Sequence, residues 1–132
     1  MPIKIVDGDF YDFTKSCDVI VAASGTVTLE IALLGVPHLL VYRVAPMTYR
    51  ILSRLVKIPY VGLCNIVSGK PLIQELLQDD VTVERLEQEI SNLMIRQGSK
   101  HQAEKIRQQV LAALGPSGGA HNAAQQIINM LD

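Results

Sequence analysis

Residues 18–30 read Asp-Val-Ile-Val-Ala-Ala-Ser-Gly-Thr-Val-Thr-Leu-Glu, and this stretch decides the fold. Residues 18–22 form an apolar run of strand length without alternation, as expected for a parallel strand buried on both faces. A turn follows at 23–25, and residues 26–34 have helical character up to the stop signal at Gly35. A strand that passes through a tight turn into a helix predicts an α/β fold.

Further strand and helix signals lie on both sides of this stretch. Further strands are expected at 3–6, 38–42 and 61–63, and helices at 9–15, 46–57, 71–77, 82–96, 99–114 and 120–131. Strands that alternate with helices imply right-handed crossovers and a parallel sheet. We therefore expect an incomplete Rossmann-like three-layer α/β domain over residues 1–96, followed by a C-terminal helical tail over residues 97–132.

Composition favours a folded, soluble domain. The chain has 132 residues, of which 48% are hydrophobic and 19% charged, so it has enough apolar material for a core and no sign of disorder. No apolar run approaches the roughly 20 residues that a membrane-spanning helix needs. Cys17 and Cys64 are isolated and lack metal-ligand spacing. These features predict a cytoplasmic protein without a metal site.

Charge is distributed unevenly along the chain. Residues 31–74 contain no Asp or Glu and carry a charge of +5, so the remainder carries −6 within a net charge of −1. Three of the cations, Arg50, Arg54 and Lys57, form a stripe on one face of a predicted amphipathic helix. A block of one sign suggests an anionic partner such as a phosphate or a membrane surface. Chance clustering on a solvated face is the alternative.

The turn after the first buried strand is a candidate phosphate site. Ligands of parallel sheets bind outside the carboxyl ends of the strands, and the first N–H groups of a helix are free to receive an anion. Ser24, Gly25 and Thr26 lie at this junction, where Gly25 leaves room for a close approach. Glu30 lies one turn further along the same helix and suits a ribose diol. An N-cap turn, and an ion pair between Glu30 and Arg43, are the alternatives.

Three more polar residues lie on or directly after predicted elements. Asn65 comes after the predicted strand at 61–63, where its amide suits a sugar hydroxyl or a phosphate. An Asx turn is the alternative. Glu75 lies on the predicted helix at 71–77 and Gln78 directly follows it, so the two could share a face, but we expect both to be solvated on the surface. The three histidines form no catalytic constellation, and His38 is expected in the core.

Several motifs together resemble the lipid-A-disaccharide synthase family. They are Ala-Ser-Gly-Thr-Val-Thr-Leu-Glu at 23–30, Leu-Leu-Gly-Val-Pro at 33–37, Tyr-Arg-Val-Ala-Pro-Met-Thr-Tyr at 42–49, Leu-Val-Lys-Ile-Pro-Tyr-Val at 55–61 and Glu-Leu-Leu-Gln-Asp-Asp at 75–80. The resemblance extends over nearly the whole chain and implies part of the C-terminal domain of a two-domain GT-B glycosyltransferase. The family usually has Pro before its Asn, whereas this chain has Cys64.

The resemblance implies a role for each candidate residue. Ser24, Gly25 and Thr26 would hold the UDP diphosphate, Glu30 the ribose, and Arg43 would lie near the phosphates. Asn65 would serve catalysis by supporting the leaving group, with help from Gln78. The implied reaction joins UDP-2,3-diacylglucosamine to 2,3-diacylglucosamine 1-phosphate without a cofactor, because the UDP-sugar is a substrate.

The resemblance also implies partners and a location. The family acts at the inner face of the cytoplasmic membrane and not on nucleic acid. This chain corresponds to about a third of a family member, without the acceptor-binding N-terminal half and its acidic catalytic residue. We expect it to be inactive unless that half, or another copy in a homo-oligomer, completes the site. A non-catalytic interaction module, or part of another GT-B transferase, is the alternative.

Overall fold

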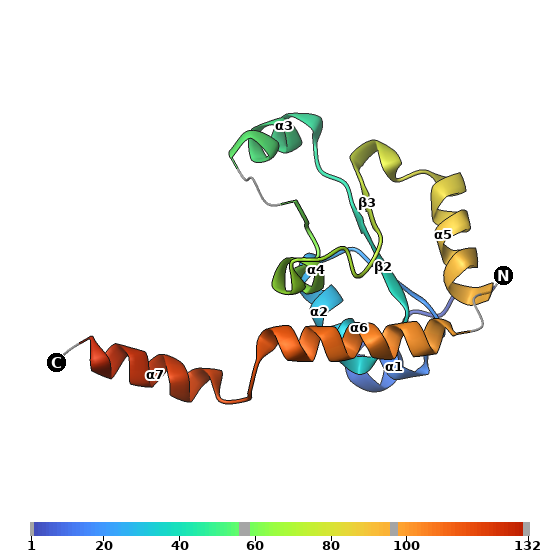
Figure 1. Cartoon of the computed structure of the whole chain (residues 1–132). Helices are drawn as coiled ribbons and strands as arrows, with labels where there is room; N and C mark the ends of the chain where they lie inside the picture. The colour runs from blue at the N-terminus through green and yellow to red at the C-terminus, as the bar shows by residue number, and fades with distance from the viewer. Residues whose placement is uncertain (1, 56–58, 96–97, 131–132) are drawn as a thin grey trace.

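The computed structural model describes residues 2–55, 59–95 and 98–130, and the side chains of 52–55 lie outside this description. Its elements follow one another along the chain as shown in Figure 1. They are α1 Phe10–Ser16, β1 Ile20–Ala22, α2 Gly25–Leu34, β2 His38–Tyr42, α3 Pro46–Leu55, α4 Leu63–Ser68, β3 Glu75–Leu77, the 3-10 turn η1 Gln78–Asp80, α5 Val83–Ile95, α6 Ser99–Leu114 and α7 Gly119–Asn129.

The sheet has three parallel strands in the order β1-β2-β3. Ala22 pairs with Leu40, and Tyr42 pairs with Leu77, so the strands end at one common edge. Helices α2 and α4 contact each other on one side of the sheet, and α5 contacts β2 from the other side (Figure 1). The predicted fold class is therefore confirmed as an incomplete Rossmann-like α/β domain with helices on both faces.

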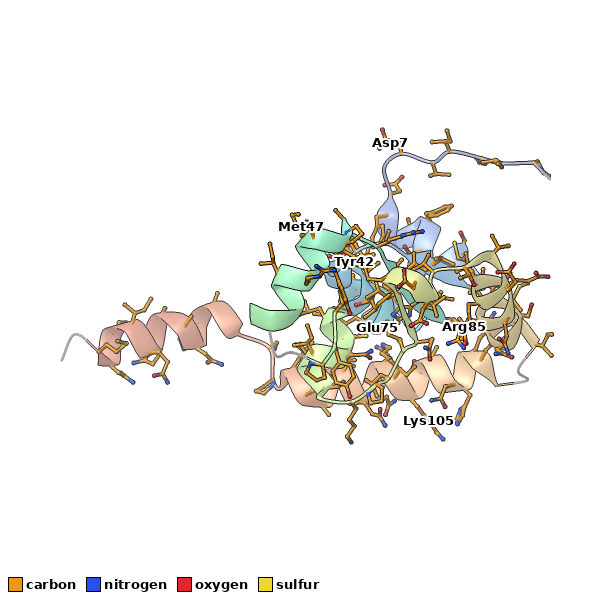
Figure 2. The ribbon with its side chains drawn as sticks, turned by 90° about the horizontal axis from the view of Figure 1, so that it is seen from above. Asp7, Tyr42, Met47, Glu75, Arg85 and Lys105 are labelled. Carbon is orange, nitrogen blue, oxygen red and sulfur yellow. The ribbon has the colours of Figure 1, made fainter. Side chains whose placement is uncertain are left out.

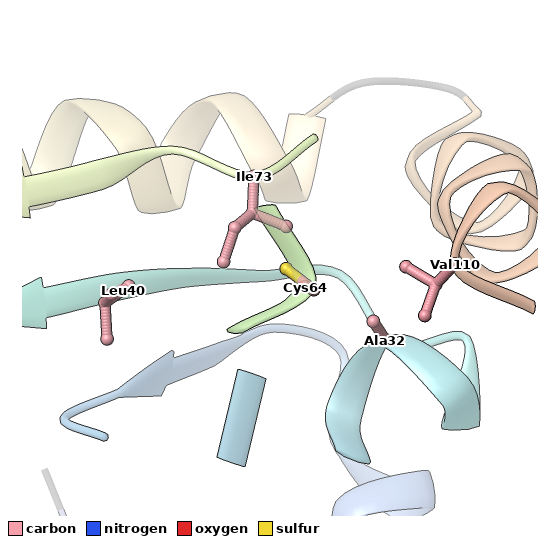
Figure 3. Packing of buried hydrophobic residues seen from close by; sticks show 5 residues of the cluster. All are labelled: Ala32, Leu40, Cys64, Ile73 and Val110. Atoms are coloured by element: carbon pink, nitrogen blue, oxygen red, sulfur yellow. The ribbon is translucent and has the colours of Figure 1, made fainter. Parts of the chain in front are cut away.

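The main core joins three helices, one strand and the segment before β3, which lie far apart in the sequence. Ala32 of α2, Leu40 of β2, Cys64 of α4, Ile73 just before β3 and Val110 of α6 pack together (Figure 3). Burying each large apolar side chain contributes about 1.5–3 kcal/mol. Helix α6 thus packs on α2 and α4 as part of the core, although it follows the boundary predicted at residue 96.

The third strand is not where the sequence analysis expected it. The predicted strand at 61–63 is wrong, because residues 61 and 62 form a bend and Leu63 begins α4. The predicted helix at 71–77 is also wrong, because Glu75–Leu77 is β3. Pairing with β2 buries Leu76 completely, and this non-local pairing overrides the local helical preference of the segment.

The predicted strand at 3–6 is also wrong. This segment has no regular structure, and Ile3 and Ile5 are 91% and 94% exposed. A strand needs a neighbour for its N–H and C=O groups, and within the described residues the sheet consists of β1, β2 and β3 alone. Helix α7 also stands apart from the body of the molecule (Figure 1), with Ile127 and Ile128 exposed.

Candidate functional site

The junction of β1 and α2 has the predicted geometry. β1 ends at Ala22 and α2 begins at Gly25, with Ser24 as an extended N-cap residue. In the described part of the chain the Ser24 side chain makes no capping hydrogen bond, and both Ser24 and Thr26 are exposed. The amino end of α2 therefore offers exposed hydroxyls beside the N–H groups of a first helical turn, which together suit an anion.

Gly25 is required by a contact with a neighbouring loop. A Cβ at this position would lie 2.5 Å from the backbone oxygen of Val61, closer than real side chains approach. The missing Cβ was expected to leave room for a ligand, but here it admits the backbone of residues 61–62. The Thr28 hydroxyl donates to the Gly25 carbonyl oxygen at 2.6 Å and fixes this turn from within α2.

One carboxylate holds that neighbouring loop. The Val61 N–H donates to Glu75 Oε2 at 2.9 Å, and the Gly62 N–H donates to Glu75 Oε1 at 2.8 Å. Asn65 Nδ2 also donates to Glu75 Oε1, at 2.9 Å. Glu75 is half-buried beside α4 (Figure 2). It was expected to be a solvated surface residue, but its carboxylate accepts three hydrogen bonds and holds the loop in place. The available signal was a single carboxylate in the otherwise uncharged segment 71–78.

Asn65 lies inside α4 and is fully buried, so its predicted position behind a strand is wrong. Besides its bond to Glu75, its amide donates to the Ile73 carbonyl and accepts from the Ile73 N–H, each at 3.0 Å. The Cys64 thiol donates to Asn65 Oδ1 at 3.7 Å, and burial raises the pKa of this thiol, which keeps it protonated. Asn65 therefore joins α4 to the segment that enters β3.

Gln78 joins the carboxyl ends of β2 and β3. Its Nε2 donates to the Val44 carbonyl at 2.9 Å, and its Oε1 accepts from the Val44 N–H at 2.8 Å. Gln78 lies in η1 whereas Glu75 lies in β3, so the predicted helical face shared by the two is wrong. Arg43 directly precedes Val44 and is exposed at the same edge.

Glu30 is half-buried on α2, one turn beyond Thr26. Among the described residues Arg85 pairs with Glu89 and Arg107 with Glu104, and no ion pair joins Glu30 to Arg43. The structural alternative proposed for Glu30, an ion pair with Arg43, is thus not found in the described part of the chain.

The predicted basic stripe is only partly described. Arg50 is exposed on α3, whereas Lys57 and the side chain of Arg54 lie outside the described residues. Helix α3 follows β2 at the same edge as the site (Figure 1), and Met47 is 76% exposed and points outward from it (Figure 2). No helix in the described ranges is long and apolar enough to cross a membrane.

His38 lies in the core, as predicted. It is 4% exposed, and its Nδ1 lies 2.8 Å from the Val36 carbonyl. Burial lowers the pKa of the imidazole, so the ring is neutral at pH 7. His38 begins β2 and therefore lies at the end of the strand opposite to the candidate site.

Comparison with known proteins decides the family. The family model described as lipid-A-disaccharide synthetase matches residues 2–129. The chain belongs to the lipid-A-disaccharide synthase family. The lipid-A-disaccharide synthase of Geobacter sulfurreducens is 37% identical over 99% of this chain, and that of Trichlorobacter lovleyi is 35% identical over all of it. The enzyme of that name from Pseudomonas putida strain F1 is 44% identical over 76% of the chain.

The matched region is a piece of those relatives. The chain spans 34% of the length of the Geobacter sulfurreducens and Trichlorobacter lovleyi lipid-A-disaccharide synthases. The family match confirms the resemblance read from the motifs and includes every predicted site residue. Those residues lie in three groups: Ser24, Gly25, Thr26 and Glu30 on the β1–α2 unit, Arg43 and Gln78 at the ends of β2 and β3, and Asn65 in the interior.

Proposed function

We propose that this chain forms part of the nucleotide-binding domain of a lipid-A-disaccharide synthase. The whole enzyme would transfer 2,3-diacylglucosamine from UDP-2,3-diacylglucosamine to 2,3-diacylglucosamine 1-phosphate. Family membership supports the reaction. The observation that carries the role of this piece is the amino end of α2, which opens at the carboxyl end of β1 beside two exposed hydroxyls.

In this proposal the diphosphate of the UDP-sugar binds at Ser24, Gly25 and Thr26. The N–H groups of the first turn, the helix dipole and the two hydroxyls stabilise its negative charge. Arg43 adds a positive charge from the end of β2, and Glu30 accepts hydrogen bonds from the ribose. Since Glu30 lacks an ion pair to Arg43 in the described structure, its carboxylate is available for this task.

The transfer breaks the bond between the sugar C1 and the diphosphate oxygen and forms a bond from C1 to the acceptor hydroxyl. Preorganised donors at the α2 turn stabilise the charge that develops on the departing UDP. The acceptor proton passes to a base in the remaining two thirds of the enzyme. Asn65 contributes through position rather than contact in this proposal, because its amide is fully buried and bonded to Glu75 and Ile73.

The remainder of the protein would complete the sheet along β1. Within the described residues β1 is an edge strand, and a groove of about 710 Å³ runs beside it between α1 and α2. Phe13 and Val21 line this groove and are 47% and 39% exposed. An uncovered edge of this kind is suited to pairing with a further strand, from the rest of the enzyme or from another copy.

The complete enzyme would work at the inner face of the cytoplasmic membrane, with α3 near the lipid substrates.

Titration of the isotope-labelled chain with UDP, followed by NMR, tests the nucleotide site. We expect the amide signals of Ser24, Gly25 and Thr26 to move at millimolar UDP, with a smaller response to uridine because it lacks the diphosphate. Glu30→Gln should weaken UDP binding by about 1–3 kcal/mol, whereas Glu84→Gln on α5 should not. Unmoved signals in the α2 turn at saturating UDP would rule out this site.

Reconstitution tests the reaction. The chain mixed with the remaining part of a family member should form the disaccharide 1-phosphate from the two lipid substrates, and neither part alone should do so. A mixture that binds UDP but forms no product, although the two parts associate, would contradict the catalytic role.

A further inference from the structure

The Glu75 carboxylate accepts three hydrogen bonds from residues 61–65, and the proposed substrate contacts do not account for them. We propose that Glu75 is a positioning residue for the nucleotide site, because its carboxylate holds residues 61–62 against the first turn of α2. This inference rests on the proposed function, since it concerns the geometry of the turn that would receive the diphosphate.

The carboxylate accepts hydrogen bonds from two consecutive backbone N–H groups in the loop next to the α2 turn. Glu75 Oε2 accepts from the Val61 N–H and Oε1 accepts from the Gly62 N–H, at 2.9 and 2.8 Å. The carbonyl oxygen of the same Val61 lies so close to Gly25 that a Cβ there would be 2.5 Å away. The Val61 backbone is therefore held on one side by Glu75 and rests on the other side against Gly25.

A second contact path runs through Gly62 and Thr28. A Cβ on Gly62 would lie 3.0 Å from Glu75 Oε1 and 3.3 Å from Thr28 Oγ1, so these groups surround Gly62 closely. The Thr28 hydroxyl in turn donates to the Gly25 carbonyl. The Glu75 carboxylate is thus linked to Gly25 through the Val61 backbone and also through Gly62, which lies close to Thr28.

The arrangement requires a carboxylate rather than any polar side chain. All three of its partners are donors: the Val61 N–H, the Gly62 N–H and Asn65 Nδ2. A glutamine at this position has the same shape, but its NH₂ group would face at least one of these donors and lose that bond. Hydrogen bonds to an ionised acceptor are about twice as strong as neutral ones, which suits a device that fixes a loop.

The test is Glu75→Gln, with Glu87→Gln on the exposed face of α5 as the matched control. In the full chain without ligand, Glu75→Gln should shift the Gly25 and Thr26 amide signals, although neither residue touches Glu75. At a temperature where circular dichroism shows both variants folded, UDP affinity should fall about tenfold in Glu75→Gln and stay unchanged in the control.

Gly62→Ala provides a second route if Glu75→Gln does not fold. It keeps the carboxylate but inserts a Cβ between Glu75 and Thr28, and it should shift the same amide signals and weaken UDP binding. A variant that is less stable to heat but keeps wild-type Gly25 signals and UDP affinity when folded would overturn the proposal. Loss of folding in both variants would also overturn it, because Glu75 would then serve stability alone.

The two proposals fail separately. If the wild-type chain does not bind UDP, the nucleotide site is wrong, while the unliganded Gly25 and Thr26 signals still decide whether Glu75 positions the turn. If the wild type binds UDP and Glu75→Gln binds it equally well, the site stands and the positioning role falls.

Discussion

Two segments meet at Gly25, and the chain encodes them in different ways. The turn at 23–26 is local: an apolar strand, a small-residue turn and a helix follow one another within 17 residues, from 18 to 34. The loop at 61–62 is non-local, since it is held by Glu75, 13 and 14 residues further along the chain. Substitutions that affect one segment and not the other show how far the site depends on each.

The largest effect is expected where the non-local segment is fastened. Asn65→Ala would leave the Ile73 N–H and carbonyl buried without partners and would remove one donor from Glu75, so it should lower the free energy of unfolding by about 3 kcal/mol. Urea unfolding followed by circular dichroism measures this change. Asn92→Ala on the exposed face of α5 is the control, and equal losses in both variants would contradict the role of Asn65.

The contact between the two segments comes next. Gly25→Ala places a Cβ 2.5 Å from the Val61 oxygen, and neither backbone yields easily, so we expect a loss of about 2 kcal/mol. Gly119→Ala at the start of α7 adds a Cβ that meets nothing within 4 Å, and it should leave stability unchanged or slightly higher. Thermal unfolding of both variants provides the comparison, and a neutral Gly25→Ala would show that the close contact does not exist.

The same division explains which features the sequence predicts. Helix α2, strand β2 and helix α6 follow from local periodicity and stop signals, and the family follows from several short motifs in order. The third strand was misplaced because Val61 is apolar but lies in a bend, whereas Leu76 becomes a strand residue only by pairing with β2. The role of Glu75 was misjudged for the same reason, since its three donors come from residues 61–65, which local patterns around residue 75 do not include.

A smaller effect is expected at the ends of β2 and β3. Gln78→Ala removes two hydrogen bonds to Val44 at a half-buried position, which should cost about 1–2 kcal/mol in the free energy of unfolding. Since Arg43 precedes Val44, the variant should also broaden the Arg43 amide signal. Gln88→Ala on the exposed face of α5 is the control, and a Gln78→Ala variant as stable as this control would show that the two strand ends are held by other contacts.

Mild acid should weaken the core around His38. Burial holds the pKa of His38 below its unfolded value of 6.5, so its neutral form contributes stability above pH 6.5 that is lost as pH falls below that value. The slope from this one group is at most about 1.4 kcal/mol per pH unit. His38→Phe should flatten the dependence of the unfolding midpoint between pH 6.5 and pH 5.5, and an unchanged slope in this variant would assign the acid sensitivity to other groups.

The smallest effect on stability, and the one most specific to function, is expected in the local segment. The Ser24 side chain makes no capping hydrogen bond in the described structure, so Ser24→Ala removes no such bond and should change the free energy of unfolding by less than about 0.5 kcal/mol. If its hydroxyl receives the diphosphate, UDP affinity should nevertheless fall several-fold, as expected for the loss of one hydrogen bond to a charged group. Ser117→Ala, in the exposed segment before α7, should change neither quantity. Stability and affinity would thus separate at Ser24. A Ser24→Ala variant that keeps wild-type UDP affinity would remove this hydroxyl from the site and leave the backbone N–H groups of α2 as the donors to be tested.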